Sequence, residues 1–145
     1  MATRIQVVFD CADPDRLAKF WAVALGYMLQ NPPQGYGSWE GFLRKTGVPE
    51  DEWNSASAVV DSAGVGPRIY FQRVQERKIV KNRVHLDLNV SGRPGTSLDD
   101  RMKRVNAEVE RLIENGATIN RPGIIEEGEY WVVMQDPEGN EFCVQ

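Results

Sequence analysis

The fold is decided by an eight-residue stretch in the second half of the chain, which contains the only histidine. It reads Arg83-Val84-His85-Leu86-Asp87-Leu88-Asn89-Val90. Aliphatic and polar residues alternate along it, and a period of two is typical of a strand with one buried face. The stretch therefore predicts a strand over residues 83–90, whose polar face brings His85, Asp87 and Asn89 to a polar cavity.

Composition limits the class of protein. The chain has 145 residues, a hydrophobic fraction of 41% and a formal net charge of −4, which together indicate a globular domain with a core of its own. The scattered basic residues give no footprint for nucleic acid, and no apolar run approaches the ~20 residues of a membrane span. Cys11 and Cys143 do not form a disulfide framework, and the N-terminus lacks a signal peptide pattern. We therefore expect a cytoplasmic protein that binds neither nucleic acid nor a membrane.

Outward from the histidine strand, the pattern predicts a chain of mixed helices and strands. One helix starts after the N-cap Asp13 and stops at Gly26; a second spans 97–115, with a buried stripe that includes Ile113. We expect residues 121–128 to form a loop. Strands are expected at residues 5–11, 27–30, 56–61, 67–74, 118–120, 130–135 and 141–145.

Residues 31–54 are the hardest part to interpret, because a Pro/Gly-rich loop is followed by a segment that fits either a short helix or a strand. The aromatic content is high for a connection. We favour the interpretation that these rings pin a long loop to the core, since large aromatic side chains are mostly buried for packing. The alternative is that some of them line an apolar pocket. The rings belong to Tyr36, Trp39, Phe42 and Trp53.

The order strand, helix, three strands occurs twice. Residues 6–11 align with 85–90, and the closing strand 68–72 aligns with 141–145. The repeat predicts an α+β fold, a single domain over residues 1–145 with two tandem βαβββ modules, residues 1–76 and 82–145. Two curved mixed sheets, each with one face left uncovered by its helix, then enclose a cleft.

With these motifs identified, the chain resembles the glyoxalase-like domain proteins of the vicinal oxygen chelate superfamily. The resemblance rests on residues 8–14 with Phe20-Trp21, on His85–Leu88, and on the turn and strand of residues 136–142. It implies a small-molecule ligand and a homodimer. Metal-dependent members include glyoxalase I and the extradiol dioxygenases, whereas bleomycin-resistance proteins bind a small molecule without a metal.

The resemblance places the metal positions at Gln6, Tyr70, His85 and Cys143. Only His85 is a good match, because amide and phenol are weak donors and the family has a carboxylate where Cys143 stands. Glu141 or Asp87 could join only if the metal moved by a residue pair, ~6.6 Å along a strand. We therefore assign no metal ligand and expect no cofactor.

His85 is either a proton-transfer group or part of a hydrogen-bond network with Asp87 or a glutamine. Glu141 is either a general base or a solvated strand residue, and Cys143 is favoured as a small buried residue over a nucleophile. The expected function is metal-independent binding of a small molecule, as in resistance or sequestration. The candidate ligand-binding residues are Gln6, Asp10, Tyr70, Gln72, His85, Asp87, Glu141 and Cys143.

The alternative function belongs to a different class. It is a divalent-metal-dependent lyase, isomerase or dioxygenase that uses His85 as one metal ligand. A further enzyme possibility is metal-free acid–base catalysis by His85 with Glu141 or Asp87.

Overall fold

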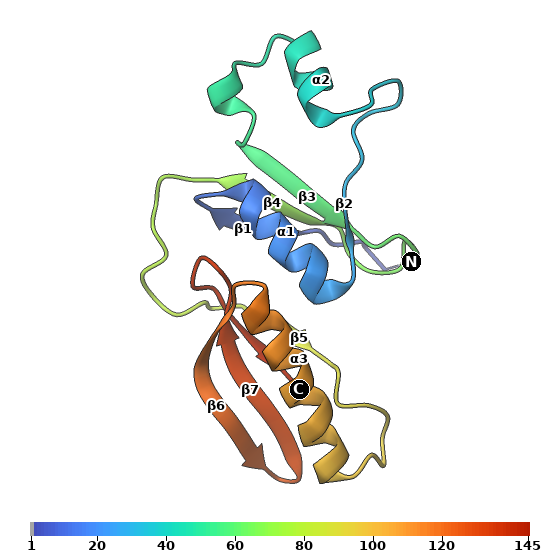
Figure 1. Cartoon of the computed structure of the whole chain (residues 1–145), viewed down its shortest axis with the longest axis vertical. Helices are drawn as coiled ribbons and strands as arrows, with labels where there is room; N and C mark the ends of the chain where they lie inside the picture. Colours follow the sequence, from blue (N-terminus) through green and yellow to red (C-terminus); the bar gives the residue numbers. More distant parts are fainter. Residues whose placement is uncertain (1) are drawn as a thin grey trace. The chain divides into compact units, whose positions relative to one another are not determined.

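The computed structural model describes residues 2–145, which contain eight strands, three α-helices and one 3₁₀ helix. These elements divide into two compact units (Figure 1), one that ends at Arg77 and one that begins at Lys78. Each unit is described by itself below. No helix among the described residues is both long enough and apolar enough to cross a membrane.

The first unit is a four-stranded sheet in the order β1-β4-β3-β2, with one helix, α1, on one face. Strand β1 is parallel to β4, and the other neighbours are antiparallel. The elements are β1 Val7–Cys11, α1 Pro14–Leu25, β2 Met28–Leu29, α2 Trp39–Lys45, the 3₁₀ helix η1 Glu50–Glu52, β3 Ala56–Val60 and β4 Ile69–Arg73.

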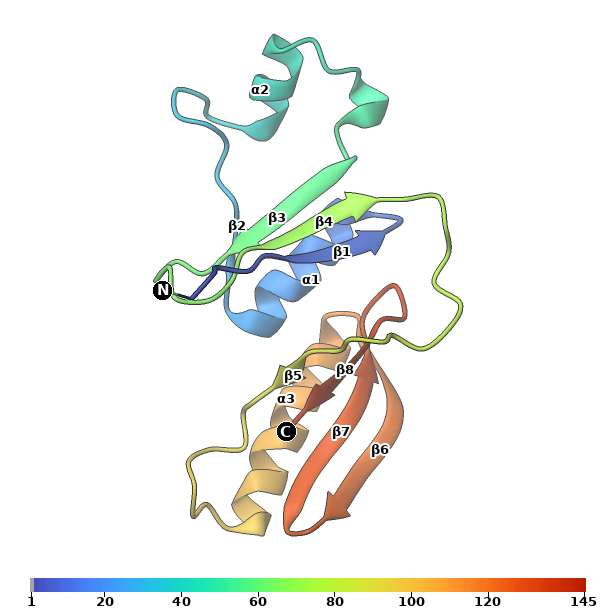
Figure 2. The ribbon, with the colours of Figure 1, turned by 180° about the vertical axis from the view of Figure 1, so that it is seen from behind.

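The second unit repeats this plan, with the strand order β5-β8-β7-β6 and β5 parallel to β8. Helix α3 lies along one face of its sheet, as the two opposite views show (Figures 1 and 2). The elements are β5 Asp87–Leu88, α3 Leu98–Glu114, β6 Thr118–Glu126, β7 Glu129–Gln135 and β8 Glu141–Val144.

Strand register confirms the internal repeat residue by residue. Val8 lies opposite Tyr70 in the first unit, and Asp87 lies opposite Cys143 in the second. These are the pairs that the sequence alignment of the two halves makes equivalent. The α+β fold built from tandem βαβββ units is therefore as predicted.

The helix boundaries follow the predicted caps. Asp13 accepts a hydrogen bond from the backbone N–H of Arg16, Pro14 opens α1, and Gly26 ends it with a φ of 66°. The Ser97 hydroxyl caps α3 by accepting from the Asp100 N–H. Each helix therefore starts at its predicted N-cap residue, and its apolar stripe packs against the sheet.

The core of each unit lies between its helix and its sheet. In the first unit, Trp21 of α1 packs on Phe9 with ring centroids 5.1 Å apart, and Phe9 stacks on Phe71 at 5.5 Å. In the second unit, α3 buries Val105, Val109 and Leu112. Burial of these residues leaves the opposite face of each sheet free for polar groups.

The histidine strand is shorter than predicted. Only Asp87 and Leu88 form the regular ladder, and Val84, expected in the core, is 80% exposed. The physical reason is that this strand lies at the sheet edge with β8 as its sole partner. Single backbone bonds from Cys143 N–H to Leu86 and from Gln145 N–H to Leu88 extend the pairing at 3.0 and 2.9 Å.

The loop predicted over residues 121–128 is also wrong. Strand β6 runs to Glu126 and absorbs the Pro-Gly pair through register shifts around Arg121. The turn to β7 has only two residues, Glu127 and Gly128, with φ of 51° and 81°, the arrangement of a tight hairpin.

Ile113, which was predicted to belong to the buried stripe of α3, is 44% exposed. The sheet covers a narrower part of the helix than the spacing suggested.

Candidate functional site

The connection between β2 and β3 forms an arm, residues 30–55, which carries α2 and η1 and extends from the sheet beyond β3 (Figure 1). No residue of α2 is buried, so the favoured interpretation of its rings as core anchors does not hold for this helix. Trp39 is 41% exposed. The helix alternative for residues 39–45 is confirmed.

A cavity of about 620 Å³ opens where the arm meets the sheet of the first unit. On its sheet side, Ala58, Arg68 and Tyr70 alternate with the buried residues of β3 and β4 and therefore lie on the face away from α1. Its arm side combines apolar residues with polar ones, among them Glu40 and Glu52. The lining residues used below are Trp39, Leu43 and Trp53 from the arm and Ala58, Arg68 and Tyr70 from the sheet.

Polar contacts hold the arm at its base. The side-chain oxygen of Asn54 accepts from the Asp15 backbone N–H at 2.9 Å, and its amide nitrogen donates to the Asp13 carboxylate at 2.8 Å. This bond from Asn54 is the main reason why the pKa of Asp13 lies below its ordinary value. An ion pair of 3.0 Å joins Glu52 to Arg73. The arm is thus tied to both α1 and β4.

Among the described residues, Arg68 is the only basic one that lines the cavity. Its Nε donates to the side-chain oxygen of Gln30 at 2.7 Å, and its Nη1 donates to that of Gln6 at 2.6 Å. Its guanidinium carbon lies 5.1 Å from the centre of the Tyr70 ring, a cation–π distance. Two amides and one ring therefore fix this cation in place.

The structure separates the predicted site residues of the first unit. Tyr70 lines the cavity, and Gln6 contacts it indirectly through Arg68. Asp10 and Gln72 lie opposite each other on β1 and β4, are exposed and are not part of the cavity lining.

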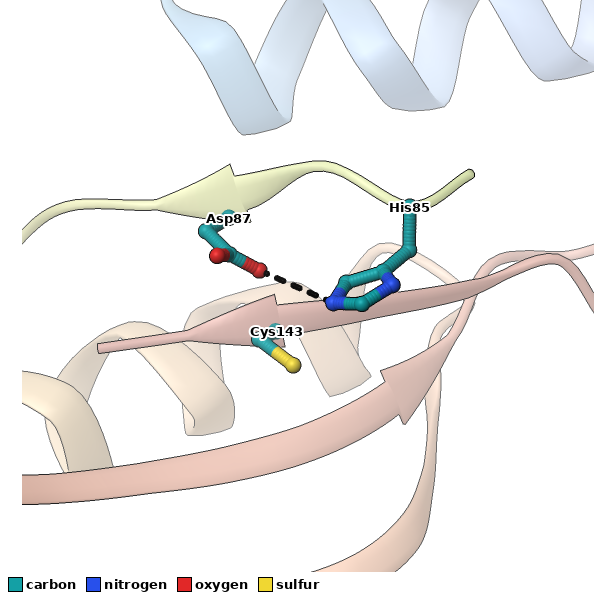
Figure 3. A group of neighbouring side chains, drawn as sticks. All are labelled: His85, Asp87 and Cys143. Carbon is teal, nitrogen blue, oxygen red and sulfur yellow. Dashed lines mark ion pairs between the residues drawn. The ribbon is translucent and has the colours of Figure 1, made fainter. Parts of the chain in front are cut away.

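In the second unit, His85 just before β5, Asp87 of β5 and Cys143 of β8 come together (Figure 3). His85 Nε2 lies 3.4 Å from Asp87 Oδ1, and one donor atom of each of the three residues lies within 4.8 Å of the others. Burial, and then the nearby Asp87 charge and a hydrogen bond to it, raise the pKa of the Cys143 thiol to about 11. This thiol is therefore neutral near pH 7.

The sequence suggested that Asp87 could bind a metal only if the metal moved along the strand, and the structure shows that this movement is not needed. Asp87 lies directly opposite Cys143 across the β5–β8 ladder, so a metal near both needs no movement along the strand. Imidazole, carboxylate and thiolate are all zinc ligands, and three protein ligands with one open position are typical of catalytic zinc sites. The donor set fits a zinc ion, provided that the thiol releases its proton on binding.

Glu141 does not join this group. It is 9% exposed and accepts from the Asn82 backbone N–H at 2.9 Å, while Lys78 Nζ lies 3.1 Å from its Oε2. Burial opposes ionisation, but the Asn82 and Lys78 contacts outweigh it, so that the pKa of Glu141 is lowered. Both oxygens are engaged in holding residues 78–82, which favours a structural role for this carboxylate.

The alternative that some aromatic rings of residues 31–54 line an apolar pocket holds for Trp39 and Trp53, which both line the cavity. Arg68 was not among the candidate ligand-binding residues. The aromatic content of residues 31–54 was the signal for the tryptophans, and strand alternation already placed Arg68 on the same face as Tyr70. The cavity could not be anticipated because it depends on how the arm folds back toward β3 and β4.

The sequence profile of the glyoxalase-like domain matches residues 6–145. The chain therefore belongs to the glyoxalase-like domain family, within the vicinal oxygen chelate superfamily. No curated protein matches the chain.

Solved structures agree on the fold. A glyoxalase/bleomycin resistance protein/dioxygenase family enzyme from Burkholderia phytofirmans PsJN is 16% identical, with a TM-score of 0.60 over 96% of this chain and 94% of that chain. A possible glyoxalase from Bacillus cereus is 14% identical (TM-score 0.61, 100% and 99% covered). The fosfomycin resistance protein FosX from Listeria monocytogenes is 9% identical (TM-score 0.62, 99% and 92% covered). At such identities, the likeness shows the fold alone.

Proposed function

We propose that this protein is a small-molecule-binding protein of the resistance or sequestration type, and that it binds its ligand without a metal in the cavity of the first unit. The observation that carries this proposal is the cavity itself, whose volume of about 620 Å³ suits a small organic ligand. Apolar walls with a few fixed polar groups are the usual composition of such sites.

Location and assembly belong to the same proposal. Neither cysteine of the described residues forms a disulfide, which agrees with a cytoplasmic location. A homodimer is proposed because the family resemblance implies one, and light scattering coupled to size-exclusion chromatography tests it directly. A monomeric mass at micromolar concentration would contradict the dimer without affecting the cavity proposal.

Ligand-induced thermal stabilisation tests the binding function. A compound that binds only the folded protein raises its Tm by mass action. We expect at least one member of a broad panel of metabolites and aromatic fragments to raise the Tm of the wild type but not that of the Trp39→Ala variant. Trp39 suits this test because no residue of its helix is buried, so the substitution removes a cavity wall without opening the core.

Two outcomes would overturn the cavity proposal. One is that no compound in the panel stabilises the wild type. The other is that every stabilising compound acts equally on Trp39→Ala, because such compounds would then bind elsewhere.

The group formed by His85, Asp87 and Cys143 supports a second function, a divalent-metal-dependent lyase, isomerase or dioxygenase. When bound, the metal polarises a substrate oxygen or activates a water molecule. The three side chains supply its ligands. In a metal-free variant of this function, His85 exchanges a proton with the substrate, and Asp87, whose Oδ1 lies 3.4 Å from His85 Nε2, orients the imidazole ring.

Metal content separates the second function from the first. If the second function holds, protein purified without chelator or affinity tag contains about one zinc per chain, and His85→Ala abolishes it. Asp10→Asn is the matched control, because Asp10 is an exposed carboxylate on the equivalent strand of the first unit. Metal-free wild-type protein that also fails to bind added zinc would leave only the cavity function.

A further inference from the structure

We infer that the cavity of the first unit selects a planar aromatic acid, with the anionic group on Arg68 and the ring between the sheet and the tryptophans of the arm. This inference rests on the proposed small-molecule-binding function and names its ligand class.

Arg68 is a cation without an anionic partner. Its two protein hydrogen bonds go to the neutral side chains of Gln30 and Gln6, and no carboxylate of the described residues lies within ion-pair distance. A guanidinium carries five N–H donors, and no described residue accepts from its Nη2. A partly buried cation with free donors favours an anion, because charge-assisted hydrogen bonds are the strongest that it can form.

Tyr70 completes the polar end of the site. Its ring lies under the guanidinium at 5.1 Å, which restrains the orientation of the fork. Both residues line the cavity. The Tyr70 hydroxyl has no hydrogen-bond partner among residues 2–145, so it is available to donate to the same anion.

The other charges of the cavity do not compete for this role. Asp15 forms an ion pair with Lys19 at 2.6 Å, and Glu52 forms one with Arg73 at 3.0 Å. Glu40 is exposed in the first turn of α2, where the N-terminal end of the helix favours a negative charge. Each of these acids thus has local compensation, and the cation at the sheet does not.

The tryptophans specify the shape of the ligand. The indole N–H of Trp39 donates to the Gln30 carbonyl at 2.7 Å, and that of Trp53 donates to the Val48 carbonyl at 2.9 Å. Because both polar edges are occupied within the arm, the rings offer apolar surface to the cavity. Offset stacking and edge-to-face contacts with a flat ring use such surface best.

Three naphthalene compounds that differ only in charge test the inference: 2-naphthoate, the neutral 2-naphthamide and the cationic 2-naphthylmethylamine. Isothermal titration calorimetry on the full-length protein gives each affinity. We expect 2-naphthoate to bind about tenfold more tightly than the amide, the scale of one charge-assisted hydrogen bond. The amine is expected to bind most weakly.

Variants separate the charge contribution from the stacking contribution. Arg68→Gln is expected to remove the preference for the acid while leaving the amide unaffected, and Trp39→Ala to weaken acid and amide alike. Arg77→Gln is the control, because Arg77 is exposed and is not part of the cavity lining; this variant should bind as the wild type does. Circular dichroism of each variant establishes that the fold is retained.

The outcomes distinguish this inference from the function on which it rests. Equal binding of acid and amide, or an acid preference that survives Arg68→Gln, overturns the aromatic-acid inference while the cavity remains a binding site. If none of the three compounds binds, but other panel compounds bind in a Trp39-dependent manner, the ligand class is wrong and the function stands. If nothing binds in a Trp39-dependent manner, both fail.

Discussion

The two units share one topology and one register and differ most in the connection between their second and third strands. In the first unit, the chain between the second and third strands runs from residue 30 to residue 55 and builds a wall beside the sheet. In the second, the same connection is only Glu127 and Gly128. The long connection creates a cavity, whereas the short one lets β6 and β7 pair along their length.

The side chains on the two uncovered faces diverge in the same way. Positions equivalent to His85, Asp87 and Cys143 hold Gln6, Val8 and Tyr70 in the first unit. The second unit therefore presents three side chains that can bind a metal but has no long arm. The first unit presents a cavity beside its arm, lined by the basic Arg68 and by three carboxylates. The repeated module thus keeps one framework while the side chains on its uncovered face differ between the two copies.

The largest expected effect concerns the shared framework. Phe142 is fully buried on β8, so Phe142→Ala should lower the free energy of unfolding of the second unit by about 3–5 kcal/mol. Ile113→Ala, on the exposed side of α3, should change it by no more than about 0.5 kcal/mol. Urea denaturation followed by circular dichroism measures both. Equal losses would mean that Ile113 belongs to the core after all.

The next effect concerns the short connection. Gly128 has a φ of 81° with open space around it, so Gly128→Ala should destabilise the second unit by about 1–2 kcal/mol through backbone strain alone. Gly37, in the arm of the first unit, has no such φ and no atom near its would-be Cβ; Gly37→Ala should be neutral. The comparison is contradicted if thermal unfolding ranks the two variants in the opposite order.

A smaller effect concerns the anchor of the arm. Asn54→Ala removes both bonds of Asn54 to the start of α1 and should cost about 1 kcal/mol at neutral pH. Because Asn54 holds the folded-state pKa of Asp13 below 3.8, this contribution is present above that pH and is lost as the pH falls through the lowered pKa. We therefore expect the difference between wild type and variant in urea denaturation to shrink in acid. A difference that grows in acid would refute this assignment.

The smallest effect concerns the group of the second unit. With a pKa raised to about 11, Cys143 should react slowly with iodoacetamide at pH 8, and faster as the pH increases. Asp87→Asn removes the negative charge that helps to raise this pKa, so the rate should increase several-fold. Peptide mapping by mass spectrometry in the presence of a chelator resolves Cys143 from the buried Cys11. An unchanged or slower rate would show that Asp87 does not act on the thiol.

The secondary-structure framework could be predicted from the sequence because the signals that specify it are local. Caps at Asp13 and Ser97, alternation along the strands and the internal repeat together predicted two βαβββ units. The prediction from sequence was wrong where strand pairing outweighs local composition. In β6, register shifts accommodate the Pro-Gly pair for which a loop was predicted. The site was partly predictable: alternation put Tyr70, His85 and Cys143 on the correct faces, but only the folded arm shows that Trp39 and Trp53 form walls.

The most direct test of the central claim, that the cavity of the first unit is the ligand site, uses the four tryptophans. In a ¹H–¹⁵N correlation spectrum each indole N–H gives one signal, and 2-naphthoate is added stepwise. We expect the Trp39 and Trp53 signals to shift together. The signals of Trp21, which is buried in the first unit, and of Trp131, which belongs to the second unit, should stay in place. Shifts confined to Trp131, or unshifted Trp39 and Trp53 signals at a 2-naphthoate concentration that calorimetry shows to be saturating, would contradict it.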